Sequence, residues 1–153
     1  VIGTVIGSVL MALVEDTYNL ERFVRAQEHV YPRVCDELRA GAKQSHWLWF
    51  IFPQIAGLGQ SAMSRRYAIA SRGEAAAYLD HPVLGPRLRE CARLVQAVNE
   101  KDITLIMGSP DDMKLQSSMT LFAHAAADNA DFVGVLKKYY GGERDAATVE
   151  RLS

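Results

Sequence analysis

Residues 109–126 of the chain read SPDDMKLQSSMTLFAHAA and carry the clearest helix signal in the sequence. Ser109 offers a capping hydroxyl, and Pro110 suits the first position of a helix. Asp111 and Asp112 place negative charge in the first turn, where the helix macrodipole is positive. Apolar residues then recur at helical spacing, at Leu115, Met119, Phe122 and Ala126. We therefore expect a helix from Pro110 to about Ala126.

Similar boundaries recur along the rest of the chain. Asn19 can cap a helix that Gly41 ends, and Pro32 predicts a kink or a break near Tyr31. The other expected helices cover residues 45–52, 71–80, 87–98, 131–140 and 145 onward, with a short turn at 103–107. Sustained period-two alternation and Asn-Gly turns are missing. The predicted fold class is all-α, a compact single-domain bundle of about seven or eight short helices.

Length and composition agree with one helical domain. The chain has 153 residues, of which 49% are hydrophobic and 23% charged, enough to build a core without disulfides. We assign that domain to residues 15–153. Residues 1–14 form an uncharged apolar extension that is too short for a membrane-spanning helix. We expect residues 1–10 to be non-native if Met11 is the initiator; the alternative is an ordered segment that contacts this or a neighbouring chain.

Charge and cysteine content exclude several classes of partner. The net charge of −1 predicts no global attraction to a nucleic acid polymer or to an anionic membrane. The four histidines are scattered and no Cys-x-x-Cys occurs, so neither a metal nor another cofactor is expected. Cys35 and Cys91 match no disulfide framework and indicate a reducing, cytoplasmic location. The oligomeric state stays open.

The segment HWLWFIFPQ, residues 46–54, allows two interpretations. A helix that is apolar on every side must be surrounded by protein, so it can be a central core helix. One edge of the same helix can also line a pocket in which an aromatic ring stacks on a planar group. The candidate lining residues here are His46, Trp47, Trp49 and Gln54.

Next comes a glycine-containing, arginine-rich segment, residues 57–72. Its three arginines are Arg65, Arg66 and Arg72, and it contains no acid. Glycine-rich backbone and guanidinium groups favour an anion such as a phosphate or carboxylate. The alternative is a simple turn whose arginines pair with acids of the C-terminal half.

The start of the 109–126 helix also carries polar side chains beside its apolar stripe, namely Asp111, Lys114 and Ser118. A Ser-Lys nucleophile pair is conceivable, since a desolvated lysine can serve as a base. The alternative interpretation is structural, with the acids supporting the helix start and the hydroxyls bonded to backbone.

Three segments together resemble a known family. They are SHWLWFIFPQIAGLGQSAMSRRYAIAS, AAAYLDHPVLGPRLREC and IMGSPDDMKLQSSMTLFAHAA. Over residues 18–152 the chain is similar to the family catalogued as domain of unknown function 1810. The resemblance implies a compact, mainly helical bacterial protein and no established reaction. Some members carry the label calpastatin, but calpain-inhibitory segments are disordered and repeated, whereas this chain has a core and no repeat.

These observations lead to two hypotheses about function. The first is a pocket, lined by the HWLWFIFPQ, GLGQSAMSRRY and SPDDMKLQSS segments, that binds and in one version processes a small anionic, nucleotide- or ADP-ribose-like ligand. The second is a protein-interaction or structural module without catalysis. Whether the chain is an enzyme is left open. The candidate ligand-binding residues are His46, Trp47, Trp49, Gln54, Arg65, Arg66, Asp111, Lys114 and Ser118.

Overall fold

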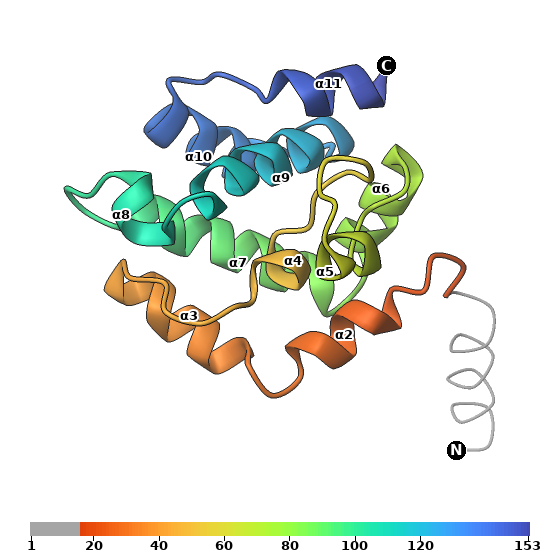
Figure 1. Ribbon diagram of the computed structural model, residues 1–153, viewed down its shortest axis with the longest axis horizontal. Coiled ribbons are helices and arrows are strands. Elements are labelled where there is room, and N and C mark those ends of the chain that lie inside the picture. Colours follow the sequence, from red (N-terminus) through yellow and green to blue (C-terminus); the bar gives the residue numbers. More distant parts are fainter. Residues whose placement is uncertain (1–15) are drawn as a thin grey trace.

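The computed structural model describes residues 16–153, and the predicted extension at residues 1–14 lies outside that range. Within it the chain forms ten helices (Figure 1). They are α2 (Glu21–Gln27), α3 (Tyr31–Ala40), α4 (Leu48–Ile51), α5 (Ala62–Arg66), α6 (Arg72–Asp80), α7 (Leu84–Ala97), α8 (Ile103–Met107), α9 (Asp111–Ala125), α10 (Ala130–Tyr140) and α11 (Ala146–Leu152).

The all-α prediction is confirmed for this part of the chain, where one isolated bridge between Ile55 and Ile69 is the extent of β pairing. The expected number of helices, seven or eight, was too low. The additional elements are α5 and α8, which have five residues each. A helix of about one turn is too short to show a repeating apolar stripe.

Helix α9 lies at the centre of the molecule. Helices α6, α8, α10 and α11 all pack against it, and Figure 1 shows it in the middle of the molecule, below α11 in the view. Every residue from Ser117 to Ala123 is buried. The predicted apolar stripe is therefore only part of a helix that is enclosed on all sides over this stretch.

Proline and glycine set several helix boundaries as predicted. The chain breaks between α2 and α3, and Pro32 occupies the first turn of α3, where its missing N–H costs no helical hydrogen bond. Gly41 and Gly141 end α3 and α10 in the left-handed conformation, with φ of 65° and 61°. Ser71 caps α6 by accepting a hydrogen bond from the Glu74 amide at 3.1 Å.

Three predicted helix starts were wrong. Asn19 has a positive φ of 54° and precedes α2 without capping it; the Asp16 carboxylate accepts from the Leu20 amide instead. Ser109 makes no capping bond, because α9 begins one residue later than predicted, at Asp111. The hydroxyl of Ser45 donates to Glu37 on α3 and does not cap α4.

The aromatic segment contributes one turn, α4, to the hydrophobic core. Leu48, Phe50, Ile51 and Phe52 are buried, together with Trp47. Trp49 is half-buried and His46 is exposed. No helix in the described part of the chain combines the length and the apolar character needed to cross a bilayer.

Candidate functional site

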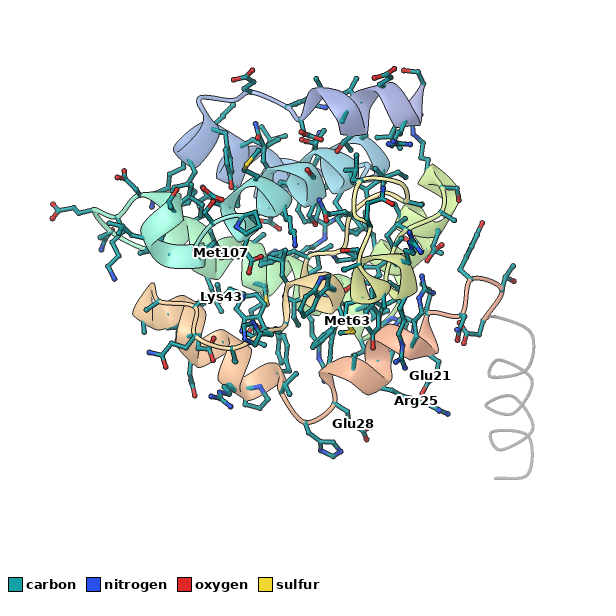
Figure 2. The ribbon with its side chains drawn as sticks, in the orientation of Figure 1. Glu21, Arg25, Glu28, Lys43, Met63 and Met107 are labelled. Carbon is teal, nitrogen blue, oxygen red and sulfur yellow. The ribbon has the colours of Figure 1, made fainter. Side chains whose placement is uncertain are left out.

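Two of the three predicted segments meet beside α9, where they form a cluster that we call the tryptophan–lysine cluster. It consists of Lys43, Trp47, Trp49, Asp111, Lys114 and Ser118. Lys43 comes from the loop after α3, and its amide donates to the Ile106 carbonyl of α8 at 2.8 Å. Figure 2 shows Lys43 between α3 and the corner where α8 leads into α9.

An acid flanked by two lysines forms the polar part of the cluster. The Lys43 ammonium lies 2.8 Å from Asp111 Oδ2, and its side chain is only 6% exposed. The Lys114 ammonium lies 4.0 Å from Asp111 Oδ1. Because one carboxylate faces two ammonium groups, the three side chains carry a net charge of about +1 at neutral pH.

Each lysine also lies near an indole ring. The Lys43 Nζ atom is 5.0 Å from the centre of the Trp47 ring, and the Lys114 Nζ atom is 6.0 Å from that of Trp49. Both distances fall within the range of cation–π attraction. The aromatic and cationic side chains are therefore coupled in pairs.

Two buried polar groups near this cluster have no partner. Trp49 Nε1 and Ser118 Oγ make no hydrogen bond within the described part of the chain. Ser118 is fully buried and lies one helical turn after Lys114, on the same side of α9. Buried donors and hydroxyls are normally paired, because leaving one unpaired costs about 1–3 kcal/mol. The Trp49 N–H lacks a hydrogen-bond acceptor, and the Ser118 hydroxyl lacks a partner of either kind among the described residues.

Trp47, in contrast, is fully engaged. Its indole N–H donates to Glu37 Oε1 at 3.0 Å, and the amides of Gln44 and Ser45 donate to the same oxygen. Burial raises the pKa of Glu37, but the hydrogen bonds from Ser45, Gln44 and Trp47 outweigh it and hold that pKa at about 2. Glu37, which is charged at neutral pH, thus fixes the orientation of Trp47.

The contacts of Arg65 and Arg66, both exposed on α5, lie away from this cluster. Arg65 donates to Gln60 at 3.4 Å, and the Arg66 guanidinium lies 5.4 Å from the ring centre of Tyr67. Within residues 16–153 neither arginine pairs with a carboxylate, nor does Arg72. The alternative in which these arginines pair with C-terminal acids was therefore wrong.

The remaining arginine of that segment lies in a shallow hollow of about 440 Å³ together with Arg151. Arg151 also donates to the Gly57 carbonyl at 3.3 Å, which ties the glycine-containing loop to α11. Gln54 is half-buried, and its backbone carbonyl accepts from Ile69 at 2.9 Å. The side chains of Gln54 and His46 make no hydrogen bond to other described residues.

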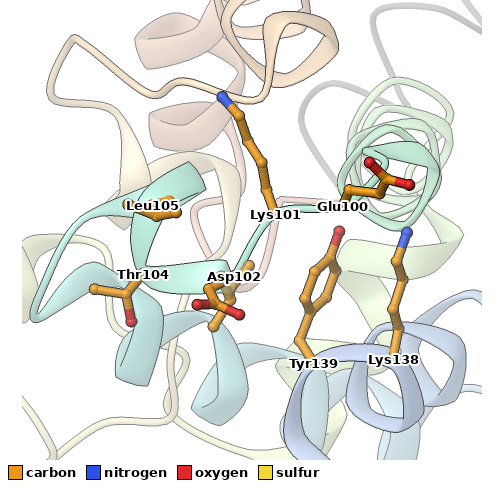
Figure 3. A pocket seen from close by; sticks show the side chains of 8 residues that line it. Glu100, Lys101, Asp102, Thr104, Leu105, Lys138 and Tyr139 are labelled. Atoms are coloured by element: carbon orange, nitrogen blue, oxygen red, sulfur yellow. The ribbon is translucent and has the colours of Figure 1, made fainter.

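A second hollow, of about 850 Å³, lies between the loop before α8 and helix α10 (Figure 3). Its lysine and tyrosine side chains already donate hydrogen bonds to backbone carbonyls at the ends of α7 and α3. Tyr139 Oη donates to the Val95 carbonyl at 2.5 Å, Lys138 donates to the carbonyls of Gln96 and Val98, and Lys101 donates to Gly41. This hollow is a poorer candidate, because few of its donors remain for a ligand.

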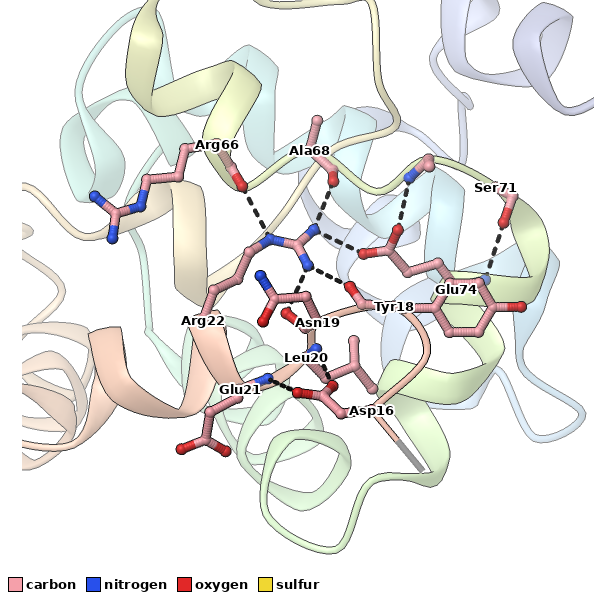
Figure 4. Close-up of polar contacts among 11 residues, drawn as sticks. Asp16, Tyr18, Asn19, Leu20, Glu21, Arg22, Arg66, Ala68, Ser71 and Glu74 are labelled. Atoms are coloured by element: carbon pink, nitrogen blue, oxygen red, sulfur yellow. Dashed lines mark hydrogen bonds and ion pairs between the residues drawn. The ribbon is translucent and has the colours of Figure 1, made fainter. Parts of the chain in front are cut away.

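Arg22 forms the densest polar arrangement in the molecule (Figure 4). Its guanidinium donates to the Glu74 carboxylate at 2.8 Å and to four backbone carbonyls, those of Tyr18, Asn19, Arg66 and Ala68. A guanidinium has five N–H donors, so little capacity remains for a ligand. We therefore assign Arg22 a structural role.

Sequence reasoning missed Lys43 and Glu37 as members or supports of the site. Lys43 lies four residues before Trp47, and a basic residue flanking an aromatic segment is a weak signal by itself. Its importance comes from Asp111, far along the chain, with which it pairs. Groups of three or more His, Cys, Asp or Glu side chains able to hold a metal ion do not occur among the described residues.

Comparison with known proteins gives a family. A family model described as "Protein of unknown function (DUF1810)" matches residues 17–152. The crystal structure of a conserved hypothetical protein from Mycobacterium tuberculosis is similar, with 57% sequence identity and a TM-score of 0.87, and the match covers 88% of this chain and 96% of that chain. No curated protein matches. The chain thus belongs to the DUF1810 family of proteins of unknown function.

Proposed function

We propose that the tryptophan–lysine cluster binds a small anionic ligand of the nucleotide or ADP-ribose type. The observation that carries the proposal is a pair of buried groups, Trp49 Nε1 and Ser118 Oγ, that have no hydrogen-bond partner among the described residues. The Trp49 ring lies near the Lys114 ammonium, and Ser118 follows Lys114 by one turn of α9. All three can donate hydrogen bonds, and an anion with several acceptor oxygens satisfies them together.

The charge of the cluster supports the same class of ligand. Asp111 neutralises one lysine and leaves about one positive charge uncompensated, close to an aromatic ring. A phosphate or carboxylate matches that charge, and a planar base matches the indole of Trp49. A cytoplasmic location is part of this proposal, because both cysteines are free thiols, as is typical of reducing compartments.

Binding is tested by calorimetry and thermal shift with three probes: inorganic phosphate, AMP and ADP-ribose. We expect at least one probe to raise the melting temperature, since a ligand that binds the folded state stabilises it by mass action. Lys114→Met should weaken binding by about tenfold or more, because it removes a charged donor. The control is Lys137→Met on α10, which removes an exposed lysine elsewhere and should leave affinity unchanged.

Ser118→Ala separates a ligand contact from a structural one. It removes a hydroxyl that has no hydrogen-bond partner in the described part of the chain, so the fold should keep its stability while affinity falls. The proposal fails if none of the probes changes stability at about 5 mM, or if Lys114→Met binds them as tightly as the wild-type chain.

The arginines of α5 enter the proposal as contacts to a longer ligand. If Arg65 and Arg66 reach the distal part of an ADP-ribose, replacing both by alanine weakens ADP-ribose binding and leaves phosphate binding unchanged. Equal affinities in the double variant would remove both arginines from the site.

A protein-interaction role is the second candidate. Leu105 on α8 and Met113 on α9 are 69% and 67% exposed. Their sequence neighbours Thr104 and Asp112 are joined by a side-chain hydrogen bond of 2.7 Å, so both apolar side chains come from one corner of the molecule. Sedimentation of the wild-type chain and of Leu105→Asp tests this candidate; a strict monomer in both cases argues against self-association.

A further inference from the structure

Two thiols meet where α3 packs against α7. Cys35 lies on α3 and Cys91 on α7, and both are buried and free. The Sγ atom of Cys35 lies 3.6 Å from Oε1 of Glu90, the residue directly before Cys91. The Sγ atom of Cys91 lies 4.0 Å from the hydroxyl of Tyr31, one helical turn before Cys35. These reciprocal contacts place both thiols in the same region of the α3–α7 interface.

The surroundings shift the pKa values of the two thiols in opposite directions. A hydrogen bond from Cys91 lowers the pKa of Cys35 to about 7, against the opposing effects of burial and of the Glu90 carboxylate. The same hydrogen bond, together with burial, raises the pKa of Cys91 well above its ordinary value. Cys35 is thus the thiol that ionises near neutral pH and acts as the nucleophile, while Cys91 stays protonated beside it.

We infer that Cys35 and Cys91 form an oxidation site at which hydrogen peroxide converts the two thiols into a disulfide joining α3 to α7. The site shares no residue with the tryptophan–lysine cluster and does not depend on ligand binding there. Hydrogen peroxide is little larger than water, which suits the 3% exposure of Cys35.

The reaction has two steps. The Cys35 thiolate attacks a peroxide oxygen: an S–O bond forms, the O–O bond breaks, and the departing hydroxide takes up the proton lost by the thiol and becomes water. The sulfur of Cys91 then attacks the sulfenic sulfur: an S–S bond forms, the S–O bond breaks, and hydroxide leaves with the Cys91 proton as a second water. The two sulfurs lose two electrons and one peroxide gains them.

The test treats the purified chain with hydrogen peroxide, quenches it, and alkylates the unfolded protein with N-ethylmaleimide before mass spectrometry. We expect a loss of about 2 Da, no alkylated cysteine, and one cross-linked peptide pair containing both residues. Cys91→Ser removes the second step, so Cys35 should accumulate as a sulfenic acid, about 16 Da heavier, which dimedone traps. In Cys35→Ser, Cys91 should remain fully alkylated.

Oxidation of the unfolded chain is the control for the role of the folded geometry. In urea the two thiols are 56 positions apart on an unfolded chain, so the cross-link should form at least about tenfold more slowly than in the folded protein. Equal rates would overturn the inference. So would two alkylated cysteines in the peroxide-treated folded chain, or a Cys35 sulfinic acid alongside a free Cys91.

Discussion

Among single residues, Glu37 shows how one buried carboxylate organises a loop. It is 8% exposed and accepts hydrogen bonds from the Gln44 and Ser45 amides and from the Trp47 indole. Its pKa of about 2 lies below its ordinary value of 4.5, so the folded state binds its proton more weakly than the unfolded state does. The stabilisation is complete above about pH 4.5 and is lost as the pH falls toward 2.

Replacing Glu37 by glutamine should remove this contribution. We expect a loss of about 3 kcal/mol in the free energy of unfolding at pH 7, since each pKa unit corresponds to about 1.4 kcal/mol. The variant should also lose stability less steeply than the wild-type chain between about pH 4.5 and pH 2. Urea unfolding across this range measures both effects.

The neighbouring residue provides the control for that measurement. Asp36 has a side chain that is 77% exposed, and among residues 16–153 it pairs only with Arg39. Asp36→Asn removes the same charge one position away and should change stability by less than about 1 kcal/mol. Equal losses in the two variants would contradict the role given to Glu37.

The two tryptophans mark the limit of sequence reasoning for single residues. Trp47 and Trp49 were predicted together as pocket-lining residues, because they are two positions apart in one aromatic segment. The structure gives Trp47 a buried acidic partner, whereas the Trp49 N–H has no partner within residues 16–153. That difference depends on Glu37, which belongs to another helix, and local spacing does not contain it.

At the scale of helices, glycine positions test how closely α6 and α7 approach each other. A Cβ atom placed on Gly85 would lie 2.0 Å from the backbone carbonyl oxygen of Leu79. Backbone cannot move aside without shifting a helix, so Gly85→Ala should destabilise the fold by about 3 kcal/mol. Thermal unfolding monitored by circular dichroism measures the change.

Gly134, inside α10, provides the control for Gly85, because it is also a glycine within a helix. A Cβ atom there would lie 2.4 Å from Gln96 Oε1, the end of a flexible and exposed side chain. Gly134→Ala should therefore be neutral or stabilise the protein by up to about 1 kcal/mol, because alanine favours helix. If Gly134→Ala lost as much stability as Gly85→Ala, a clash with a side chain would be as costly as a clash with backbone, and the explanation given for Gly85 would be wrong.

Most helices were predictable because their boundaries are local. Pro32, Gly41, Ser71 and Gly141 act through their own backbone or through residues three positions away. The wrong helix starts have a different origin. Asp16, and not Asn19, accepts the hydrogen bond from the Leu20 amide at the start of α2. This depends on a turn at Asn19 that the sequence pattern does not specify.

At the scale of the whole molecule, Arg22 joins the first described helix to segments far along the chain. It bonds to Arg66 and Ala68 and pairs with Glu74, which is only 3% exposed. Arg22→Lys keeps the charge but loses the planar set of donors. We expect a loss of about 2 kcal/mol in urea unfolding with an unchanged m-value, because the segments still fold together.

Arg25 is the control for Arg22 on the same helix. Its side chain is 78% exposed and pairs with Glu21 at 3.5 Å, and Figure 2 shows both residues at the outer edge of α2. Arg25→Lys should change stability by less than about 0.5 kcal/mol. A comparable loss in the two variants would show that general charge placement, and not the Arg22 contacts, holds α2.

The candidate site was predictable only in part, because it depends on how helices that are distant in the sequence pack against one another. The segments around Trp49 and Lys114 were each identifiable from residue type, and their residues lie near each other. The pairing of Lys43 with Asp111 depends on how α3, α8 and α9 pack. No local pattern specifies that packing.

The placement of the two indoles has a practical consequence for spectroscopy. The chain contains two tryptophans, and Trp47 is buried against the core while Trp49 lies half-buried beside an ammonium group. In Trp47→Phe, all tryptophan fluorescence therefore originates from Trp49, beside Lys114; in Trp49→Phe, it originates from Trp47, which is buried in the core. A single turn of helix thus provides separate optical signals for ligand binding and for unfolding.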